Sequence, residues 1–402
     1  MATNLKSDFH FASAGTRADL VSRAEALIPS LRERAQQTQS ERHLSLATKK
    51  DLEDAGVARL LQPARWGGVE GHLFGVVEIL SAIGSGCGST AWCLAQYIGH
   101  NFMVAQWPLA AQEAIWGEKP DSLIAGILIP LQGKAKKVDG GYRLSGRWPF
   151  VSGVGICDWC ILSGMVENPN GEDEERYFLA RQGDFEIIDT WYAMGLKGSG
   201  SNDVAVEDMF FPDEMTLPID HLKGGPTPGN AINNGPLFQM PSYMQFGIYI
   251  TSATLGIARG MIEHYEDFIA GHKALMSGKT SRDEVTQQLK IAEAAVCLKS
   301  ARSLALETCN QIMAHVDAGT LPDHRERTEY RAHGAFIGRL AWRAANVIWD
   351  AAMGRGVYES NPLAESYRDM SAASRHFTHN WDVNGTSYGR LRLGLPIDNP
   401  AL

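Results

Sequence analysis

The spacing of apolar residues changes twice along this chain, and these changes limit the possible folds more than any other feature. Over about the first 120 residues the apolar positions follow the helical period, which is typical of helices with one buried face. Between about residues 121 and 217, short alternating runs indicate strands instead. After a segment at 218–240 that is rich in Gly, Pro and Asn, the helical spacing returns. We therefore predict a helical domain at 1–120, a small antiparallel β-domain at 121–217 and a helical domain at 218–402.

The helical signals are clearest where an apolar face coincides with a start or stop signal. Ser281 and Glu284 have the spacing of a capping box, which predicts the start of a long helix with an apolar stripe. Another helix is expected at 325–353, ending at Gly354. In the first domain we expect four helices, at 17–34, 48–55, 72–83 and 89–107.

The strand signals begin with a hairpin. Residues 134–138 and 142–145 alternate on either side of Asp139-Gly140-Gly141, a turn sequence. Further strands are expected at 159–164, 177–180, 185–189 and 204–211.

The composition excludes several classes of function. The net charge of −9 and pI near 5.8 argue against a nucleic-acid partner, because phosphate binding needs a concentrated basic face. No apolar run reaches the ~18 residues of a membrane span, and the N-terminus lacks the apolar core of a signal peptide. We therefore expect a cytoplasmic protein that does not bind membranes.

Cys157-Asp158-Trp159-Cys160 is a CxxC motif, which can indicate redox or metal chemistry. It lies in an apolar run, however, and no second CxxC or histidine pair completes four zinc ligands. We expect no metal site, and we interpret the cysteines as packed thiols in a reducing compartment.

The C-terminal segment around Arg368-Asp369 and His376-Phe377 carries the most informative motif. It resembles the last helical region of the acyl-CoA dehydrogenase superfamily, in which an Arg-Asp pair precedes the active-site position by about two turns. The dehydrogenases have a catalytic carboxylate there, whereas this chain has a histidine beside that position. This histidine resembles the one in the oxygenase components of two-component flavin-dependent monooxygenases of the p-hydroxyphenylacetate hydroxylase type. The alternative is that His376 only caps or packs a helix.

Three further motifs strengthen the resemblance. Trp191-Tyr192 leads into Lys197 to Ser201, whose glycines and serines resemble the family's strand beside the flavin, so Gly200 and Ser201 are candidate flavin contacts. Trp148 to Gly153 resembles the segment at the reactive edge of the flavin and places Ser152 near N5.

The third motif lies in the first domain. Thr90-Ala91-Trp92 is followed eight residues later by His100, so both side chains fall on nearly the same helical face. The family has a histidine at this spacing beside its aromatic substrate, and Trp92 is expected to contact the flavin. A satisfied core histidine is the alternative. Gly354 with Arg355-Gly356 resembles a turn that reaches the flavin of a neighbouring subunit, although a helix C-cap explains Gly354 equally well.

The resemblance implies a fold, an activity and partners. The fold is mainly α, with an N-terminal helical domain, a small β-barrel and a C-terminal four-helix bundle, assembled as a homotetramer. The activity is hydroxylation of a phenolic or heteroaromatic substrate by O2 and reduced flavin (FMNH2 or FADH2) through a flavin C4a-hydroperoxide. A separate NAD(P)H-flavin reductase supplies the flavin, since no G-x-G-x-x-G unit is visible here. His376 is the first candidate base, His100 the second, and Ser152 supports the flavin.

Two departures from the family pattern bear on the substrate. The segment Ala125 to Pro130 is apolar where the p-hydroxyphenylacetate enzyme has serines, and Ser242-Tyr243-Met244 replaces an arginine. Both indicate a different, less polar substrate. Two other functions stay open at this point: an acyl-CoA dehydrogenase-like flavoprotein with a displaced base, and a non-catalytic flavin-fold binding protein.

Overall fold

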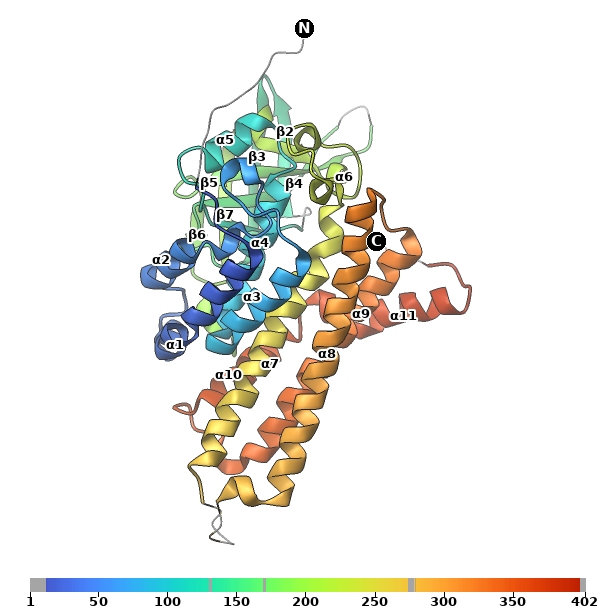
Figure 1. The fold of residues 1–402 in the computed structure, drawn as a ribbon. Helices are drawn as coiled ribbons and strands as arrows, with labels where there is room; N and C mark the ends of the chain where they lie inside the picture. Colours follow the sequence, from blue (N-terminus) through green and yellow to red (C-terminus); the bar gives the residue numbers. More distant parts are fainter. Residues whose placement is uncertain (1–11, 130–131, 169–170, 274–277, 279, 398–402) are drawn as a thin grey trace.

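The computed structural model describes residues 12–129, 132–168, 171–273, 278 and 280–397. In the described residues five α-helices precede the strands, and Figure 1 shows α1, α2 and α3 on one side of α7. Thr16 caps the first helix through a reciprocal pair of bonds with Asp19, and Gly56 ends the second in the left-handed conformation. The helices are α1 (Arg17–Glu41), α2 (Leu46–Ala55), α3 (Leu73–Gly86), α4 (Gly88–Val104) and α5 (Leu109–Trp116).

The strands form one sheet in the order β6-β7-β3-β2-β4-β5-β8, with β1 paired to β4. The hairpin of β2 and β3 turns at Asp139-Gly140, as predicted, and Gly140 has φ +70°. Two short strands, β1 and β8, were not expected. The bounds are β1 (Ile124–Gly126), β2 (Gly133–Val138), β3 (Gly141–Val151), β4 (Trp159–Val166), β5 (Glu174–Arg181), β6 (Glu186–Ile188), β7 (Asn202–Pro212) and β8 (Thr216–Pro218).

The C-terminal helices α7, α8, α9 and α10 pack together, and α11 packs on α9. Figure 1 shows α7, α8 and α9 running side by side away from the strands, while α11 points outward from the bundle. The helices are α6 (Ile219–Leu222), α7 (Phe246–Ala270), α8 (Val285–Ala318), α9 (His324–Ala352), α10 (Pro362–Ala373) and α11 (Trp381–Arg392). Helices, strands and helices thus follow one another as expected, and the domain limits at 120 and 217 stay a prediction.

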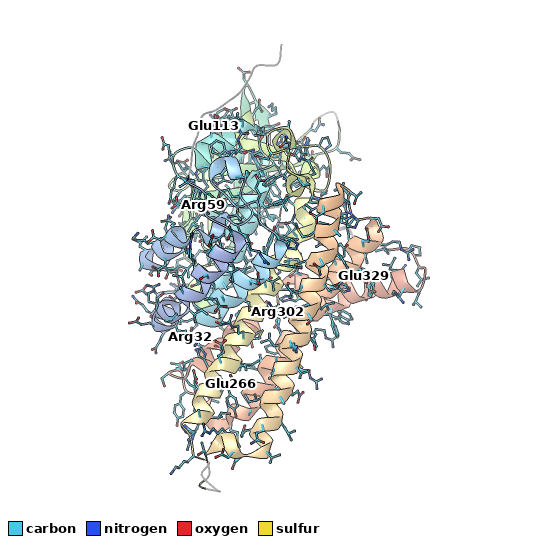
Figure 2. All side chains as sticks on the ribbon, in the orientation of Figure 1. Arg32, Arg59, Glu113, Glu266, Arg302 and Glu329 are labelled. Atoms are coloured by element: carbon cyan, nitrogen blue, oxygen red, sulfur yellow. The ribbon has the colours of Figure 1, made fainter. Side chains whose placement is uncertain are left out.

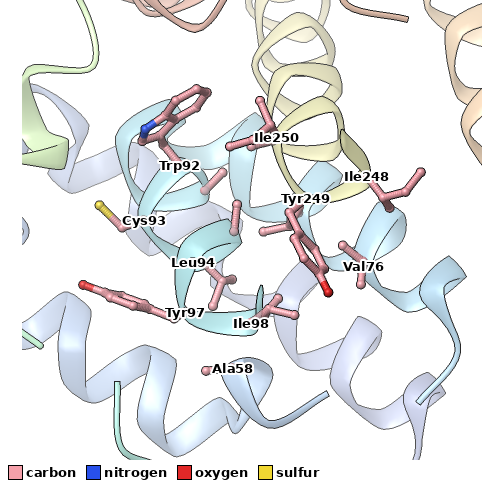
Figure 3. Close-up of a cluster of buried hydrophobic side chains, with 14 of the residues drawn as sticks. Ala58, Val76, Trp92, Cys93, Leu94, Tyr97, Ile98, Ile248, Tyr249 and Ile250 are labelled. Atoms are coloured by element: carbon pink, nitrogen blue, oxygen red, sulfur yellow. The ribbon is translucent and has the colours of Figure 1, made fainter. Parts of the chain in front are cut away.

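Glycines allow α3 to approach α7 closely. A Cβ on Gly84 would lie 2.7 Å from the Cα of Gly256, and a Cβ on Gly256 would lie 2.5 Å from the Leu80 carbonyl oxygen. Figure 3 shows the neighbouring core, where Trp92 of α4 lies near Ile250 of α7. The N-terminal helices and the bundle therefore share one continuous core.

The start of α8 corrects one prediction. Glu284 is the N-cap residue and Val285 the first helical residue, whereas Ser281 opens a separate 3-10 turn, so the capping box between Ser281 and Glu284 was wrong. The apolar stripe that follows also begins outside the core, because Val285 and Leu289 are 67% and 65% exposed. Charged side chains such as Glu266 and Arg302 lie on the outer faces of the same bundle (Figure 2).

One further correction concerns the length of a helix. Helix α1 continues to Glu41, seven residues beyond the predicted end at Arg34. Within the described residues, every helix is too short or too polar to cross a bilayer.

Candidate functional site

The pairing of β3 with β7 brings two predicted site residues together. Val151, the last residue of β3, pairs with Asn202, the first residue of β7. Ser152 follows β3 and Ser201 precedes β7, so both serines lie at the same end of this strand pair. Their hydroxyl oxygens are 2.8 Å apart.

An irregularity in β3 directs the chain into this site. The register with β7 shifts between Trp148 and Val151, and Phe150 has a positive φ of 66°. This conformation is uncommon for a bulky residue and costs of order 1–3 kcal/mol. Phe150 stays 61% exposed, with its ring against Trp191. Strain and an exposed aromatic ring two residues before Ser152 are typical of a ligand-binding segment.

Hydroxyl groups form a chain that starts at Trp92. The indole Nε1–H of Trp92 donates to Ser152 Oγ at 3.2 Å, Ser152 Oγ lies 2.8 Å from Ser201 Oγ, and Ser201 Oγ lies 2.7 Å from Ser199 Oγ. Ser199 Oγ donates to the carbonyl oxygen of Leu196 at 2.7 Å. We call these four side chains the serine relay.

The two ends of the serine relay determine its direction. A carbonyl oxygen only accepts, so the single hydroxyl hydrogen of Ser199 is donated to the carbonyl oxygen of Leu196. Ser201 must then donate to Ser199, and Ser152 must donate to Ser201. Each of Ser152 and Ser201 keeps one unused lone pair and no unused hydrogen. The relay therefore offers acceptors, and not donors, to a bound molecule.

Glycines shape the loops on both sides of the serine relay. Gly153 has φ +74°, and a Cβ there would lie 2.1 Å from the Tyr97 hydroxyl oxygen. That hydroxyl donates to the Gly153 carbonyl at 2.8 Å. Gly200 has φ +50° and lies against the backbone of Arg42. Both positions need glycine because a side chain would be strained or would clash.

Asp369 ties this loop to the helical domains. One carboxylate oxygen accepts from the backbone N–H of Leu196 at 2.6 Å, and both oxygens accept from Gln39 Nε2 of α1. Burial, together with the nearby Glu365 carboxylate, raises the pKa of Asp369 to about 7. The sequence motif included Asp369 but gave it no role; an acidic residue at a helix position that faces the core was the available signal.

His376 lies where α10 ends and meets the serine relay through Trp92. Its ring is edge-on to the indole, with centroids 5.4 Å apart. Its Nδ1 lies 2.9 Å from Thr378 Oγ1 and accepts from the Thr378 backbone N–H, which caps the short turn Phe377–His379. A capped Nδ1 puts the proton of the neutral ring on Nε2. His376 therefore makes the capping contact with Thr378, and its ring also contacts Trp92 of the serine relay.

His100 lies further along α4 and has the opposite tautomer. Its Nδ1 lies 2.8 Å from the carbonyl oxygen of Ile124, which only accepts, so Nδ1 carries the proton. Nε2 is buried and has no hydrogen-bond partner among the described residues. A buried lone pair without a partner is costly, and it points to a donor supplied by a ligand. Burial lowers the pKa of His100 to about 4, so the ring is neutral at pH 7.

The remaining predicted residue, Gly354, is not part of this cluster. It follows the end of α9, where Tyr265 in the last turns of α7 donates to the Ala351 carbonyl. Trp92, by contrast, lies near Ile250 in the first turns of α7 (Figure 3). A Cβ on Gly354 would meet nothing within 4 Å. Within this chain the structure brings Trp92, Ser152, Ser201 and His376 together, with Gly200 in the adjoining loop.

The CxxC cysteines lie outside the site. Both thiols are buried; burial raises the pKa of Cys157 to about 12, and it also raises the pKa of Cys160 above its ordinary value. No group of His, Cys, Asp or Glu in the described parts of the chain is arranged to hold a metal ion.

The site fits a flavin ring. Acceptor oxygens at Ser152 and Ser201 suit an N–H group, and the glycine loops at 153 and 200 allow close approach of the backbone. Phe377 is 63% exposed next to His376 and, with Phe150, supplies apolar surface for an aromatic ring system.

Comparison with known proteins gives consistent matches. The family model described as "Acyl-CoA dehydrogenase, C-terminal domain" matches residues 248–381. The chain is 31% identical to "Flavin-dependent monooxygenase, oxygenase subunit HsaA" of Rhodococcus jostii, over 93% of this chain and 98% of the relative. It is 29% identical to "FADH(2)-dependent resorcinol hydroxylase, oxygenase component" of Rhizobium sp., over 94% of each.

A solved structure agrees with these matches. The HsaA monooxygenase from M. tuberculosis superimposes with a TM-score of 0.90 at 26% identity, covering 96% of this chain and all of that one. The similarity therefore extends over the helical and sheet parts together.

Proposed function

The chain belongs to the oxygenase components of two-component flavin-dependent monooxygenases with the acyl-CoA dehydrogenase fold, and on this basis we propose roles for its site residues. It is an enzyme that uses reduced flavin from a separate reductase, together with O2, to hydroxylate an aromatic substrate. Ser152, Ser201 and Trp92 hold the reactive edge of the flavin, and Gly200 lets the backbone approach it.

The direction of the serine relay is the observation that carries this proposal. Reduced flavin has an N–H at N5, whereas oxidised flavin has an acceptor nitrogen there. Ser152 and Ser201 each retain only a lone pair, because Ser199 directs their hydrogens toward Leu196. The relay therefore complements reduced flavin and not oxidised flavin, as expected for a flavin that arrives reduced.

When bound, the reduced flavin supplies the activation of O2 and the transfer of an oxygen atom. The protein handles the proton of the substrate hydroxyl. Ionising a phenol with a pKa near 10 at pH 7 costs about 4 kcal/mol. A neutral imidazole within hydrogen-bond reach lowers this cost by accepting the proton as the reaction proceeds.

The tautomers assign complementary parts to the two histidines. His100 Nε2 has an unused lone pair and suits acceptance of the substrate proton. His376 keeps its proton on Nε2 and suits donation to an oxygen atom beside Trp92. We therefore propose His100 as the acceptor and His376 as the donor. This reverses the order in which the sequence placed them.

We also propose a homotetramer in the cytoplasm. Val285, Leu289 and Val296 lie on one face of α8 and are 67%, 65% and 63% exposed, an apolar stripe that a second copy would cover. Gly354, exposed at the end of α9, would then reach the flavin of a neighbouring subunit. The free cysteines of the described chain support a reducing compartment.

Oxygen uptake with supplied reduced flavin tests the activity. A generic flavin reductase, NADH and either FMN or FAD would be combined with the protein and a panel of phenols, indoles and polycyclic aromatics. Coupling of oxygen uptake to a hydroxylated product is expected for at least one compound. A yellow protein whose flavin is reduced directly by an acyl-CoA would instead support a dehydrogenase. Absence of both reactions would support a binding protein.

A further inference from the structure

A cavity of about 130 Å³ lies beside the proposed active site, between the first turns of α7, α9 and the segment that follows His376. Its wall includes Tyr243, Phe246, Tyr330, Arg331 and Thr378. An engineered cavity of ~150 Å³ binds benzene, so this space is sufficient for about one ring or a short substituent.

Arg331 is the only charged side chain in the wall among the described residues. Its guanidinium has no ion pair or hydrogen bond with any described residue. Burial lowers its pKa, which reflects the cost of keeping a cation away from water. The nearest acidic residues along α9 are engaged elsewhere: Glu326 with His315, and Glu329 with Tyr388 and His333. A partly buried cation that has no ion pair among the described residues favours an anion bound in the cavity beside it.

The cavity comes close to His376, although neither His376 nor His100 lines it. Thr378 lines it and contacts His376 Nδ1 at 2.9 Å. Tyr243 lines it and is hydrogen-bonded to Tyr177, whose hydroxyl donates to the Leu128 carbonyl two residues after Gly126. A Cβ on Gly126 would lie 2.9 Å from the His100 ring. The Thr378 side chain therefore lies between the cavity and His376, and the cavity's link to His100 runs through Tyr243, Tyr177 and residues 126–128.

We propose that the substrate is an aromatic compound with an anionic substituent, such as a carboxylate, and that Arg331 binds this group. The inference rests on the proposed hydroxylase function and specifies its substrate class. The chain lacks an arginine at Ser242-Tyr243-Met244, which predicted a less polar substrate; Arg331 supplies a cation to the same cavity from α9 instead.

Matched acid and ester ligands test the proposal. Calorimetry would measure Kd for hydroxyphenyl-acetate, -propionate and -butyrate and for their methyl esters. We expect the wild-type protein to bind at least one acid roughly tenfold to a hundredfold more tightly than its ester, because a charge-assisted bond to the guanidinium is lost in the ester. Arg331→Met should remove this preference and Arg331→Lys should keep part of it. Arg325→Met, an exposed arginine on the same helix, is the matched control.

The alternatives for Arg331 give different results. If it binds a flavin phosphate, Arg331→Met would weaken binding of reduced FMN relative to reduced riboflavin and leave the acid preference intact. If it pairs with a neighbouring subunit, the variant would change the oligomeric state in light scattering. Either result, or equal binding of acids and esters in the wild type, would overturn the proposal. Hydroxylation confined to neutral phenols would also refute it while leaving the hydroxylase function standing.

Discussion

The imidazole of His376 stands edge-on against the indole of Trp92, with ring centroids 5.4 Å apart and planes at 78°. The same indole donates its N–H to Ser152. Trp92 therefore connects a histidine that follows α10 with the serine that follows β3.

The two roles of His376 can be separated with one substitution. Asparagine is a good N-cap residue and preserves the bond from the Thr378 N–H, whereas alanine removes it. If His376 acts on the substrate, His376→Asn should impair hydroxylation by roughly 10²–10⁴-fold. Flavin oxidation should continue and release hydrogen peroxide. Product and peroxide would be measured after rapid mixing of reduced flavin, protein and oxygen.

A purely structural role predicts another pattern. His376→Ala would lower the melting temperature, His376→Asn would not, and both would keep the full product yield per flavin. That result would transfer the catalytic role to His100 alone. His100→Gln should then abolish the coupling.

Ser199 should control the preference for reduced flavin. In Ser199→Ala the hydrogens of Ser201 and Ser152 are no longer directed toward Leu196, and Ser152 can donate to oxidised flavin. We expect the ratio of oxidised to reduced Kd to fall roughly two- to tenfold, the contribution of one hydrogen bond. Anaerobic fluorescence titration of both redox forms measures it. Ser122→Ala, which also removes a buried hydroxyl that donates to backbone carbonyls, should leave the ratio unchanged.

The hydroxylation rate should not follow an ordinary histidine titration. Burial lowers the pKa of His100 to about 4 and that of His376 to about 3, so both rings stay neutral as the pH falls from 8 to 5.5. Protonation would remove the acceptor only below this range. The rate of product formation in a single turnover should therefore not change between pH 5.5 and pH 8. An acid limb centred near the ordinary histidine value of ~6.5 would contradict the assignment.

Asp369 should make stability depend on pH. Its pKa is about 7 in the folded protein, against 3.8 for a solvent-exposed carboxyl, so the folded state holds a proton that the unfolded state releases first. The stabilisation is complete below about pH 4 and is lost as the pH rises toward 7. Asp369→Asn cannot lose this proton. Its unfolding free energy relative to wild type should rise over that range, by at most about 4 kcal/mol.

Urea unfolding at pH 4.5, 5.5 and 7 measures this difference. The exposed Asp382→Asn should show no comparable trend. A constant difference between Asp369→Asn and wild type would mean that Asp369 is already ionised in the folded protein at pH 4.5.

The exposed stripe on α8 should hold the subunits together. Leu289→Glu places a charge in the middle of the stripe between Val285 and Val296, and burying that charge against a second copy is unfavourable. We expect light scattering to show a tetramer for the wild type and smaller species for the variant. The control is Lys299→Glu, an exposed position on the same helix. Glu293→Leu is not used because it would break the ion pair between Glu293 and Arg343. A wild-type monomer at micromolar concentration would refute the tetramer.

The sequence by itself determined the features that depend on residues close to one another in the sequence. The change from helical to alternating spacing gave the order of helices, strands and helices, and the turn at Asp139-Gly140 gave the hairpin. The motifs at Trp92, Ser152, Ser201 and His376 marked residues that the structure then brings together. These features are local because backbone geometry and turn chemistry act over a few residues.

Only the tertiary structure decided which distant residues meet. The bond from the Leu196 N–H to Asp369 spans 173 positions, and that from Gln39 to Asp369 spans 330. The last turns of α1 lack the helical spacing of apolar residues. The buried Thr38 and the hydrogen bond from Gln39 to Asp369 hold these turns in the helix. The direction of the serine relay likewise depends on every element around it, as does the lack of an ion pair for Arg331 among the described residues. Residue spacing reports only a local period, whereas these properties follow from the packing of several elements at once.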